Sequence, residues 1–187
     1  MTLITLFVAS ALSILRLGNV DDPGVTTFLS IQGQRVTVSG QTSVGGFRCT
    51  LETETEATKI ALQGGSGSGA ALLYLTLPVK QFSCGNFLLN RDFQKTLKME
   101  QYSHIRVEVL RLQPNGNHYM GKLDLTVAGT KKKLDNIQFR NQTYKKSKVL
   151  RTQLTLKMSE FGLTPPSRFG GLVRVEEELV IEVDLIL

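Results

Sequence analysis

The chain has 187 residues, of which 41% are hydrophobic and 20% are charged, with 17 Gly and no Trp. This composition is that of a folded globular protein and excludes a disordered or collagen-like chain, and the length is enough for one all-β domain with its own core. The formal net charge of +6 is mildly basic, so charge alone identifies no partner.

The first segment has the composition of a secretory signal. Leu3 to Leu15 form an apolar run that is too short to span a bilayer, and turn-forming residues follow it from Gly18 to Gly24. No Lys or Arg precedes the run, and the alternative reading is a buried N-terminal helix. We expect a signal peptide over residues 1–20, a periplasmic or secreted location, and a single folded domain over residues 21–187.

Strands with one apolar face dominate the rest of the chain. Apolar residues occupy every second position from 179 to 187, and the same period of two recurs at residues 36–38, 47–51, 73–77, 123–127, 137–139 and 154–158. Between Ile105 and Leu112 the phase of the alternation shifts, which predicts a β-bulge or a strand that crosses a barrel rim. Turn-forming segments separate the runs, so we expect an antiparallel sheet of about eight to ten strands.

Two cysteines, Cys49 and Cys84, lie in the first half of the chain. An even pair in a chain expected to meet an oxidising compartment predicts a disulfide. In the chain-entropy model, closing a loop of this length stabilises the fold by about 4 kcal/mol. Two free, buried thiols are the alternative.

One stretch departs from the strand pattern: residues 83–98 read SCGNFLLNRDFQKTLK. Leu89, Phe93 and Leu97 recur every fourth residue, which predicts an amphipathic helix over about residues 86–99. Asn86 and Asn90 are both candidates for its N-cap. If the sheet closes into a barrel, the helix fits best as a cover over an end or a seam, with its apolar stripe shielding the interior.

The sequence carries no recognisable catalytic or metal-binding motif. Gly64 to Gly69 lack the Lys and the spacing of a phosphate-binding loop, and they predict a hairpin loop. His104 and His118 have no Cys or second His at metal-ligand spacing. The period-two carboxylates from Glu52 to Glu56 share a solvated strand face and give no support for an acid–base pair. We therefore expect neither an enzyme nor a resident metal or cofactor.

Two lysine clusters carry much of the positive charge. They occupy residues 131–133 and residues 145, 146 and 148, in predicted polar turns. Such clusters suit transient contact with the anionic headgroups of a membrane surface. Stacking aromatic residues are not interleaved with them, so we expect no nucleic-acid partner.

Four segments follow one another in the order of a known family. They are VTVSGQTSVGGFRCTLE at 36–52, LPVKQFSCGNFLLNRDFQKTLKMEQYSHIRVEV at 77–109, MGKLDLTVAGTKKKL at 120–134, and LKMSEFGLTPPSRFGGLVRVEEELVIEVDL at 156–185. In this order they resemble the first strands, the strand–helix–strand block, the hairpin and the closing strand of the YceI-like family of exported polyisoprenoid-binding proteins. Leu89 stands where the family usually has Met, and Ser103 where it usually has Pro.

The resemblance implies an all-β, lipocalin-like extended antiparallel barrel of about eight strands that encloses an apolar channel. The implied partner is an isoprenoid lipid, such as a quinone or a polyprenyl chain, held without catalysis in the periplasm. The candidate channel-wall residues are Leu73, Leu75, Phe93, Leu97, Ile105, Val107, Val109, Leu123, Leu125, Leu154, Leu156, Phe161, Ile181 and Val183. Cys49 and Cys84 would tie the first wall strand to the start of the helix.

A packed core and a lipid channel produce the same pattern of alternating apolar residues. The alternative function is therefore an exported structural or protein-interaction barrel with a packed interior and no lipid ligand. The sequence fixes neither the length of a lipid tail nor the oligomeric state, and a homodimer is left open.

Overall fold

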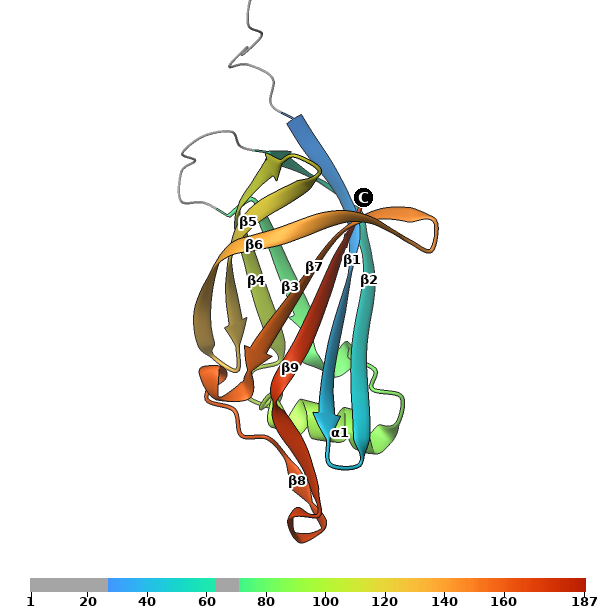
Figure 1. The fold of residues 1–187 in the computed structure, drawn as a ribbon, viewed down its shortest axis with the longest axis vertical. Coiled ribbons are helices and arrows are strands. Elements are labelled where there is room, and N and C mark those ends of the chain that lie inside the picture. The colour runs from blue at the N-terminus through green and yellow to red at the C-terminus, as the bar shows by residue number, and fades with distance from the viewer. Residues whose placement is uncertain (1–26, 63–70) are drawn as a thin grey trace, which may run out of the picture.

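The structure is a computed structural model that describes residues 27–62 and 71–187. The predicted signal peptide over residues 1–20 and the glycine-rich segment from Gly64 to Gly69 lie outside the described residues. Among the residues that are described, no helix is long and apolar enough to cross a membrane. The chain forms a tall, curved sheet with one α-helix at its lower end (Figure 1).

Over residues 27–62 and 71–187, nine strands make up the sheet, and all their pairings are antiparallel. They are β1 (Thr27–Thr42), β2 (Gly45–Leu62), β3 (Leu73–Pro78), β4 (His104–Asn115), β5 (His118–Val127), β6 (Thr130–Tyr144), β7 (Ser147–Lys157), β8 (Ser167–Arg168) and β9 (Val173–Ile186). Eight of them follow the order β2-β1-β9-β7-β6-β5-β4-β3, and the short β8 pairs with β9. The predicted all-β, lipocalin-like barrel of about eight strands is confirmed.

The helix α1 (Phe87–Thr96) lies between β3 and β4 in the chain, where the amphipathic pattern predicts it. Three short 3-10 turns are found at Val79–Gln81, Met158–Phe161 and Phe169–Gly171. We refer to the end of the barrel at α1 as the helix end, and to the opposite end, where β1 begins and β9 ends, as the far end (Figure 1).

The barrel closes between its edge strands, β2 and β3, near the helix end. Thr50 of β2 and Ser83, which follows β3, exchange two backbone hydrogen bonds of 2.9 Å. The predicted disulfide is confirmed next to this bridge, between Cys49 and Cys84. Within the described segments no further ladder joins β2 to β3, so the barrel is nearly rather than fully closed.

Alternation along the strands sorts side chains between the interior and the outer face, as a period of two requires. On β9, Leu179, Ile181 and Val183 face the interior, whereas Val180 is 37% exposed on the outside. The phase shift predicted near residue 110 is a bulge, because the pairing of β4 with β5 slips between Val109 and Arg111. The extra residue bends β4 and keeps apolar residues on the inner face on both sides of it.

The interior is packed at the far end. Six of its side chains are 2% exposed or less: Ile31, Ile60, Leu112, Phe139, Leu150 and Leu185. They come from strands on opposite sides of the barrel and fill the space between them. Toward the helix end the same inward alternation continues, but the side chains no longer meet, and a cavity opens.

A buried ion pair stabilises the outer face where β1, β9 and β7 lie side by side. Asp184 is fully buried and accepts hydrogen bonds from Arg151 Nε at 2.6 Å and Nη2 at 2.8 Å, and from Arg35 Nη1 at 3.3 Å. The ring of Tyr144, at the tip of the β6–β7 hairpin, lies 4.5 Å from the Arg35 guanidinium and covers it. The hydrogen bonds to Asp184 raise the pKa of Arg151. The Asp184 carboxylate thus links β1, β7 and β9, and Arg35 extends this contact to the tip of the β6–β7 hairpin.

Replacing Asp184 by Asn keeps the shape of the side chain but removes the charge that two arginines share. We expect the free energy of unfolding to fall by about 3 kcal/mol, because breaking a buried pair leaves charge uncompensated. Urea denaturation at neutral pH measures this change. The control is Asp135→Asn, since its pair with Lys122 at 3.0 Å is solvent-exposed and should contribute less than about 1 kcal/mol. Equal losses in the two variants would contradict the role given to Asp184.

Candidate functional site: an apolar channel

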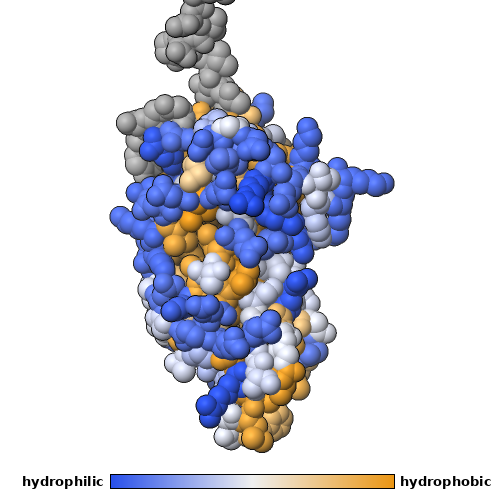
Figure 2. Space-filling model, viewed as in Figure 1, coloured by the Kyte–Doolittle hydropathy of each residue, from blue (hydrophilic) through white to orange (hydrophobic). Residues whose placement is uncertain are grey.

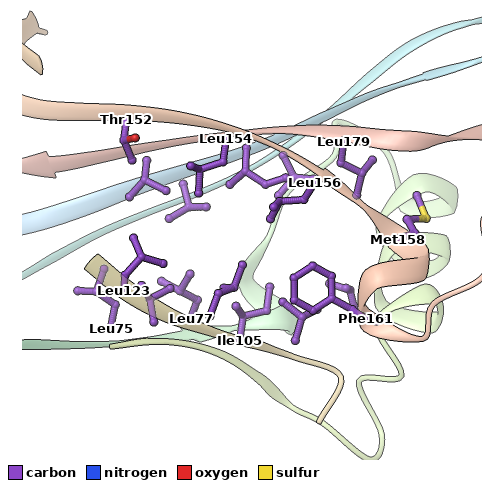
Figure 3. Close-up of a pocket in the computed structure, with 18 of the residues that line it drawn as sticks. Leu75, Leu77, Ile105, Leu123, Thr152, Leu154, Leu156, Met158, Phe161 and Leu179 are labelled. Atoms are coloured by element: carbon purple, nitrogen blue, oxygen red, sulfur yellow. The ribbon is translucent and has the colours of Figure 1, made fainter. Parts of the chain in front are cut away.

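A first cavity runs inside the barrel from its middle to the helix end. Its volume is about 100 Å³, whereas a site for one buried water needs about 10–15 Å³. Seven labelled side chains face one another across it in Figure 3: Leu154, Leu156 and Leu179 on one side, and Leu75, Leu77, Ile105 and Leu123 on the other. Phe161 and Met158 lie at the helix end of this space and Thr152 at its other end (Figure 3).

Thirteen of the fourteen candidate channel-wall residues line this cavity. They are Leu75, Phe93, Leu97, Ile105, Val107, Val109, Leu123, Leu125, Leu154, Leu156, Phe161, Ile181 and Val183. The exception is Leu73, which is buried but does not line the cavity. It begins the edge strand β3 and pairs with Val109 of β4, which does line the cavity. Whether these residues bind a lipid stays a prediction.

Eleven further residues line the first cavity and were not among the candidates. They are Val36, Val38, Leu77, Val127, Phe139, Thr152, Lys157, Met158, Leu163, Leu179 and Leu185. Most share the inward parity of neighbouring candidates on the same strand, so the period-two pattern could have found them. Among the described residues, Thr152 and Lys157 are the only polar side chains in the lining. A cavity with so apolar a wall stays dry and favours an apolar occupant.

The helix α1 forms the floor of this cavity. Its apolar stripe of Leu89, Phe93 and Leu97 packs against the core, and the ring of Phe93 lies 5.1 Å from that of Phe82. Asn86 is the N-cap, because its side chain accepts a hydrogen bond from the Leu89 backbone N–H at 2.9 Å. Asn90 instead accepts one from the Cys84 backbone N–H at 2.6 Å. The helix predicted as a cover therefore closes one end of the barrel.

A second cavity continues from the first, between α1, the turn that joins β1 to β2, and the β8–β9 hairpin. Its volume is about 130 Å³. Six residues line both cavities: Val38, Phe93, Leu97, Met158, Leu163 and Leu179. The two cavities therefore adjoin, and these side chains lie at the boundary between them. We call the two adjoining cavities together the channel.

The second cavity is mainly apolar, but its lining in the described residues includes four polar side chains. Asp92 of α1 and Arg168 of β8 both line the second cavity, and Arg168 donates from Nε to Asp92 Oδ2 at 2.6 Å and from Nη2 to Oδ1. This two-point contact raises the pKa of Arg168. Thr42 and Thr96 add hydroxyl groups to the same lining. The second cavity thus adds one charged pair and two hydroxyl groups to a mainly apolar wall.

The disulfide fixes the wall of the second cavity to the helix that forms its floor. Cys49 itself lines this cavity, and Cys84 stands two residues before the N-cap of α1. Both cysteines are buried, at 1% and 5% exposure. Together with the bridge between Thr50 and Ser83, the bond holds α1 beneath the barrel as the pairing of the two cysteines predicts.

The wall of the first cavity is interrupted between β6 and β7. These strands pair from Tyr144 and Ser147 down to Arg140 and Arg151, and in the described residues nearer the helix end no backbone pairing joins them. Leu134, Ile137 and Leu154 are half-buried along the gap, and Figure 2 shows apolar side chains at the surface where the two strands diverge. The cavity thus lies close to the surface on this side.

Polar contacts close the gap at the helix end. Lys132 of β6 pairs with Glu160 in the turn after β7, and the Thr130 hydroxyl donates to the Phe161 carbonyl at 3.3 Å. The Lys132 ammonium, together with the Lys157 backbone N–H, lowers the pKa of Glu160. A carboxylate with a lowered pKa stabilises the fold above its ordinary pKa and loses that effect in acid, so this ion pair is present at neutral pH and is lost in acid.

The other candidates for chemistry lie apart from the channel. The ring of His104 shares a hydrogen bond with the Ser103 hydroxyl, the ring of His118 shares one with the Asn117 side chain, and neither histidine lines the two cavities. Among the described residues, no three His, Cys, Asp or Glu side chains are grouped as metal ligands would be. The lysine clusters are partly engaged in ion pairs: Lys131 contacts Asp124 at 2.9 Å, and Lys145 contacts Glu52 at 3.2 Å.

No protein-family model matches the chain, and no curated protein matches it. Among solved structures, BcnA of Burkholderia cenocepacia matches with a TM-score of 0.52 and 13% sequence identity, over 82% of this chain and 96% of BcnA. One mutant of the CJ YCEI protein matches with a TM-score of 0.46 and 11% identity, over 100% of this chain and 98% of the mutant. A second mutant, with a monobromobimane guest, matches with a TM-score of 0.44 and 12% identity, over 100% of this chain and 99% of the mutant. At these identities the likeness to BcnA shows the fold alone. The observed barrel and this likeness confirm the fold that the resemblance to the YceI-like family implies.

Proposed function

We propose that this protein is an exported, non-catalytic carrier or store for an isoprenoid lipid, such as an isoprenoid quinone, whose tail occupies the channel. The observation that carries the proposal is the pair of adjoining, mainly apolar cavities between the far-end core and the helix end. A hollow interior at the helix end favours this function over an interaction barrel that is packed throughout.

The shape and chemistry of the channel suit a thin, flexible tail. Burying one CH₂ group contributes about 0.8 kcal/mol, and this contribution needs no directional contact. The inner cavity offers almost no polar partner, so the tail supplies most of the affinity there. A polar headgroup would remain in the outer cavity, where Asp92, Arg168, Thr42 and Thr96 lie.

A carrier role is proposed because the polar side chains of the channel do not form a catalytic group. Asp92 and Arg168 are engaged with each other, and the remaining polar members of the lining are Thr42, Thr96, Thr152 and Lys157. A nucleophile needs an adjacent base within hydrogen-bonding distance, and none of these side chains supplies such a pair in the described part of the chain.

The disulfide supports the proposed location outside the cytoplasm. Disulfides form and persist in oxidising compartments such as the periplasm. The bond between Cys49 and Cys84 is buried and joins two elements of the proposed binding site. The proposed location is therefore the periplasm or the exterior of the cell.

The test is a series of quinones with the same headgroup and tails of increasing length, titrated into the protein. We expect the affinity to rise at least about tenfold per added isoprenoid unit, because about 1.4 kcal/mol corresponds to tenfold, and then to level off when the channel is full. Prenyl alcohols of equal tail length should bind similarly, and the lipid should be recovered unaltered. An affinity that does not depend on the tail would contradict the proposal.

A further inference from the structure

Large apolar side chains are exposed at three places at the helix end, which are two turns and the first turn of α1. We refer to these places as the three turns. The side chains are those of Val44 in the turn between β1 and β2, Phe87 and Leu88 at the start of α1, and Phe169 and Leu172 in the β8–β9 hairpin. Their exposed fractions range from 57% for Leu88 to 78% for Leu172. In the space-filling view, apolar side chains gather at the lowest point of the molecule (Figure 2). We name these five residues the tip.

The three turns are fixed to one another. The Ser43 hydroxyl donates to the Leu172 carbonyl at 2.9 Å, and the Ser43 backbone N–H donates to the Arg174 carbonyl at 3.0 Å. The ion pair between Asp92 and Arg168 joins α1 to the β8–β9 hairpin. The tip is therefore a preformed surface, which loses little conformational freedom when it binds.

The backbone at Phe169 is held in an unfavourable conformation. Its φ is 52°, and Gly170 and Gly171 follow with φ of 64° and 95°. The left-handed region is rare for an aromatic residue and is expected where the surrounding structure or a function requires it. Here the conformation places no side chain in the core, since Phe169 is 75% exposed. The turn presents an aromatic ring to the solvent.

The charge around the tip is positive. Cations outnumber carboxylates in the segments that carry the tip, which are residues 42–48, 84–98 and 164–176. The cations are Arg48, Arg91, Lys95, Lys98, Arg168 and Arg174, and the carboxylates are Asp92 and Glu176. One of the two carboxylates, Asp92, is neutralised by Arg168. Projecting apolar side chains with cations around them fit the interface of an anionic bilayer, where the chains enter the acyl boundary and the cations meet the headgroups.

We propose that the tip docks the protein onto an anionic phospholipid bilayer. The second cavity lies directly behind the tip, because Thr42 and Arg168, which line it, belong to the same turns as Val44 and Phe169. Docking would place the outer end of the channel at the bilayer surface. The inference rests on the tip and its charge, and only this placement of the channel depends on the proposed function.

The test is flotation of the full chain with vesicles of phosphatidylcholine, with and without phosphatidylglycerol and free of isoprenoids. The tip variant is Phe169→Asn with Leu172→Ser, since Asn tolerates the left-handed backbone. The matched control is Phe28→Asn with Tyr74→Ser, which removes two apolar side chains that are 58% and 67% exposed on β1 and β3. Thermal melting checks that both variants are folded.

We expect the wild type and the control to float with anionic vesicles, and the tip variant to lose at least about fivefold of that binding. No flotation of the wild type, or equal flotation of the tip variant, would overturn the proposal. If the wild type does not bind vesicles but self-associates, and the tip variant does not self-associate, the proposal is overturned and the tip binds a second copy of the chain instead. Because the vesicles hold no isoprenoid, a failure here is distinct from a failure of the tail-length series.

Discussion

A Leu179→Trp protein should fold but lose binding of prenyl lipids. Leu179 lines both cavities, at the place where they adjoin. An indole at this position would fill space in both cavities at their boundary, and overpacking of this kind costs about 1–3 kcal/mol, less than the 5–15 kcal/mol of a typical fold. We expect the affinity for a long-tailed quinone to fall at least about tenfold, or about 1.4 kcal/mol.

The neighbouring Val180 supplies the matched control. It is the next residue on β9, faces the outside and is 37% exposed, so Val180→Trp adds the same side chain without entering the channel. The chain contains no Trp, so the fluorescence of each variant reports on the introduced indole alone. The indole at 179 should be shielded from a water-soluble quencher and the one at 180 accessible. Equal lipid affinity of the two variants would show that the boundary between the cavities is not the binding site.

Removing the disulfide by Cys49→Ser with Cys84→Ser should produce the largest loss of stability. The bond closes a loop between residues separated by 35 positions, and the chain-entropy model gives about 4 kcal/mol for such a loop. For a domain of this size each kcal/mol corresponds to about 2–4 °C in Tm, so we expect Tm to fall by about 8–16 °C. Differential scanning calorimetry of the oxidised protein and the double variant measures the difference.

Reductant provides the control for this prediction. It should lower the Tm of the wild type toward that of the double variant and leave the double variant unchanged. Because the bond also holds α1 beneath the barrel, the double variant should release bound lipid faster than the wild type. A double variant with the same Tm and the same lipid retention would show that the bridge at Thr50 and Ser83 alone closes this end of the barrel.

The sequence predicts the fold well because the barrel follows from local patterns. Alternation on β9 separates Leu179 and Ile181 from Val180, and the structure places the first two inside and the third outside. The spacing of Leu89, Phe93 and Leu97 predicts the helix and the face that it buries. Ten of the thirteen candidates that line the cavity lie on strands, where a period of two determines which face a residue occupies.

Other features depend on distances that no local pattern encodes. Asp92 and Arg168 are 76 residues apart and meet only because the β8–β9 hairpin folds beneath α1. Leu73 has the alternation of a channel residue and is buried beside Val109, but only Val109 lines the cavity. Whether inward-facing leucines fill a barrel or line a channel depends on the separation of the walls, and the periodicity of the sequence does not report that separation.

The most direct test of the lipid-carrier proposal is native mass spectrometry with solvent extraction, on protein purified from a bacterial envelope that contains isoprenoid quinones. The proposal predicts a stoichiometric adduct that is released as an intact prenyl lipid and is absent from Leu179→Trp. A mass equal to that of the polypeptide alone, unchanged after incubation with quinones, would contradict it.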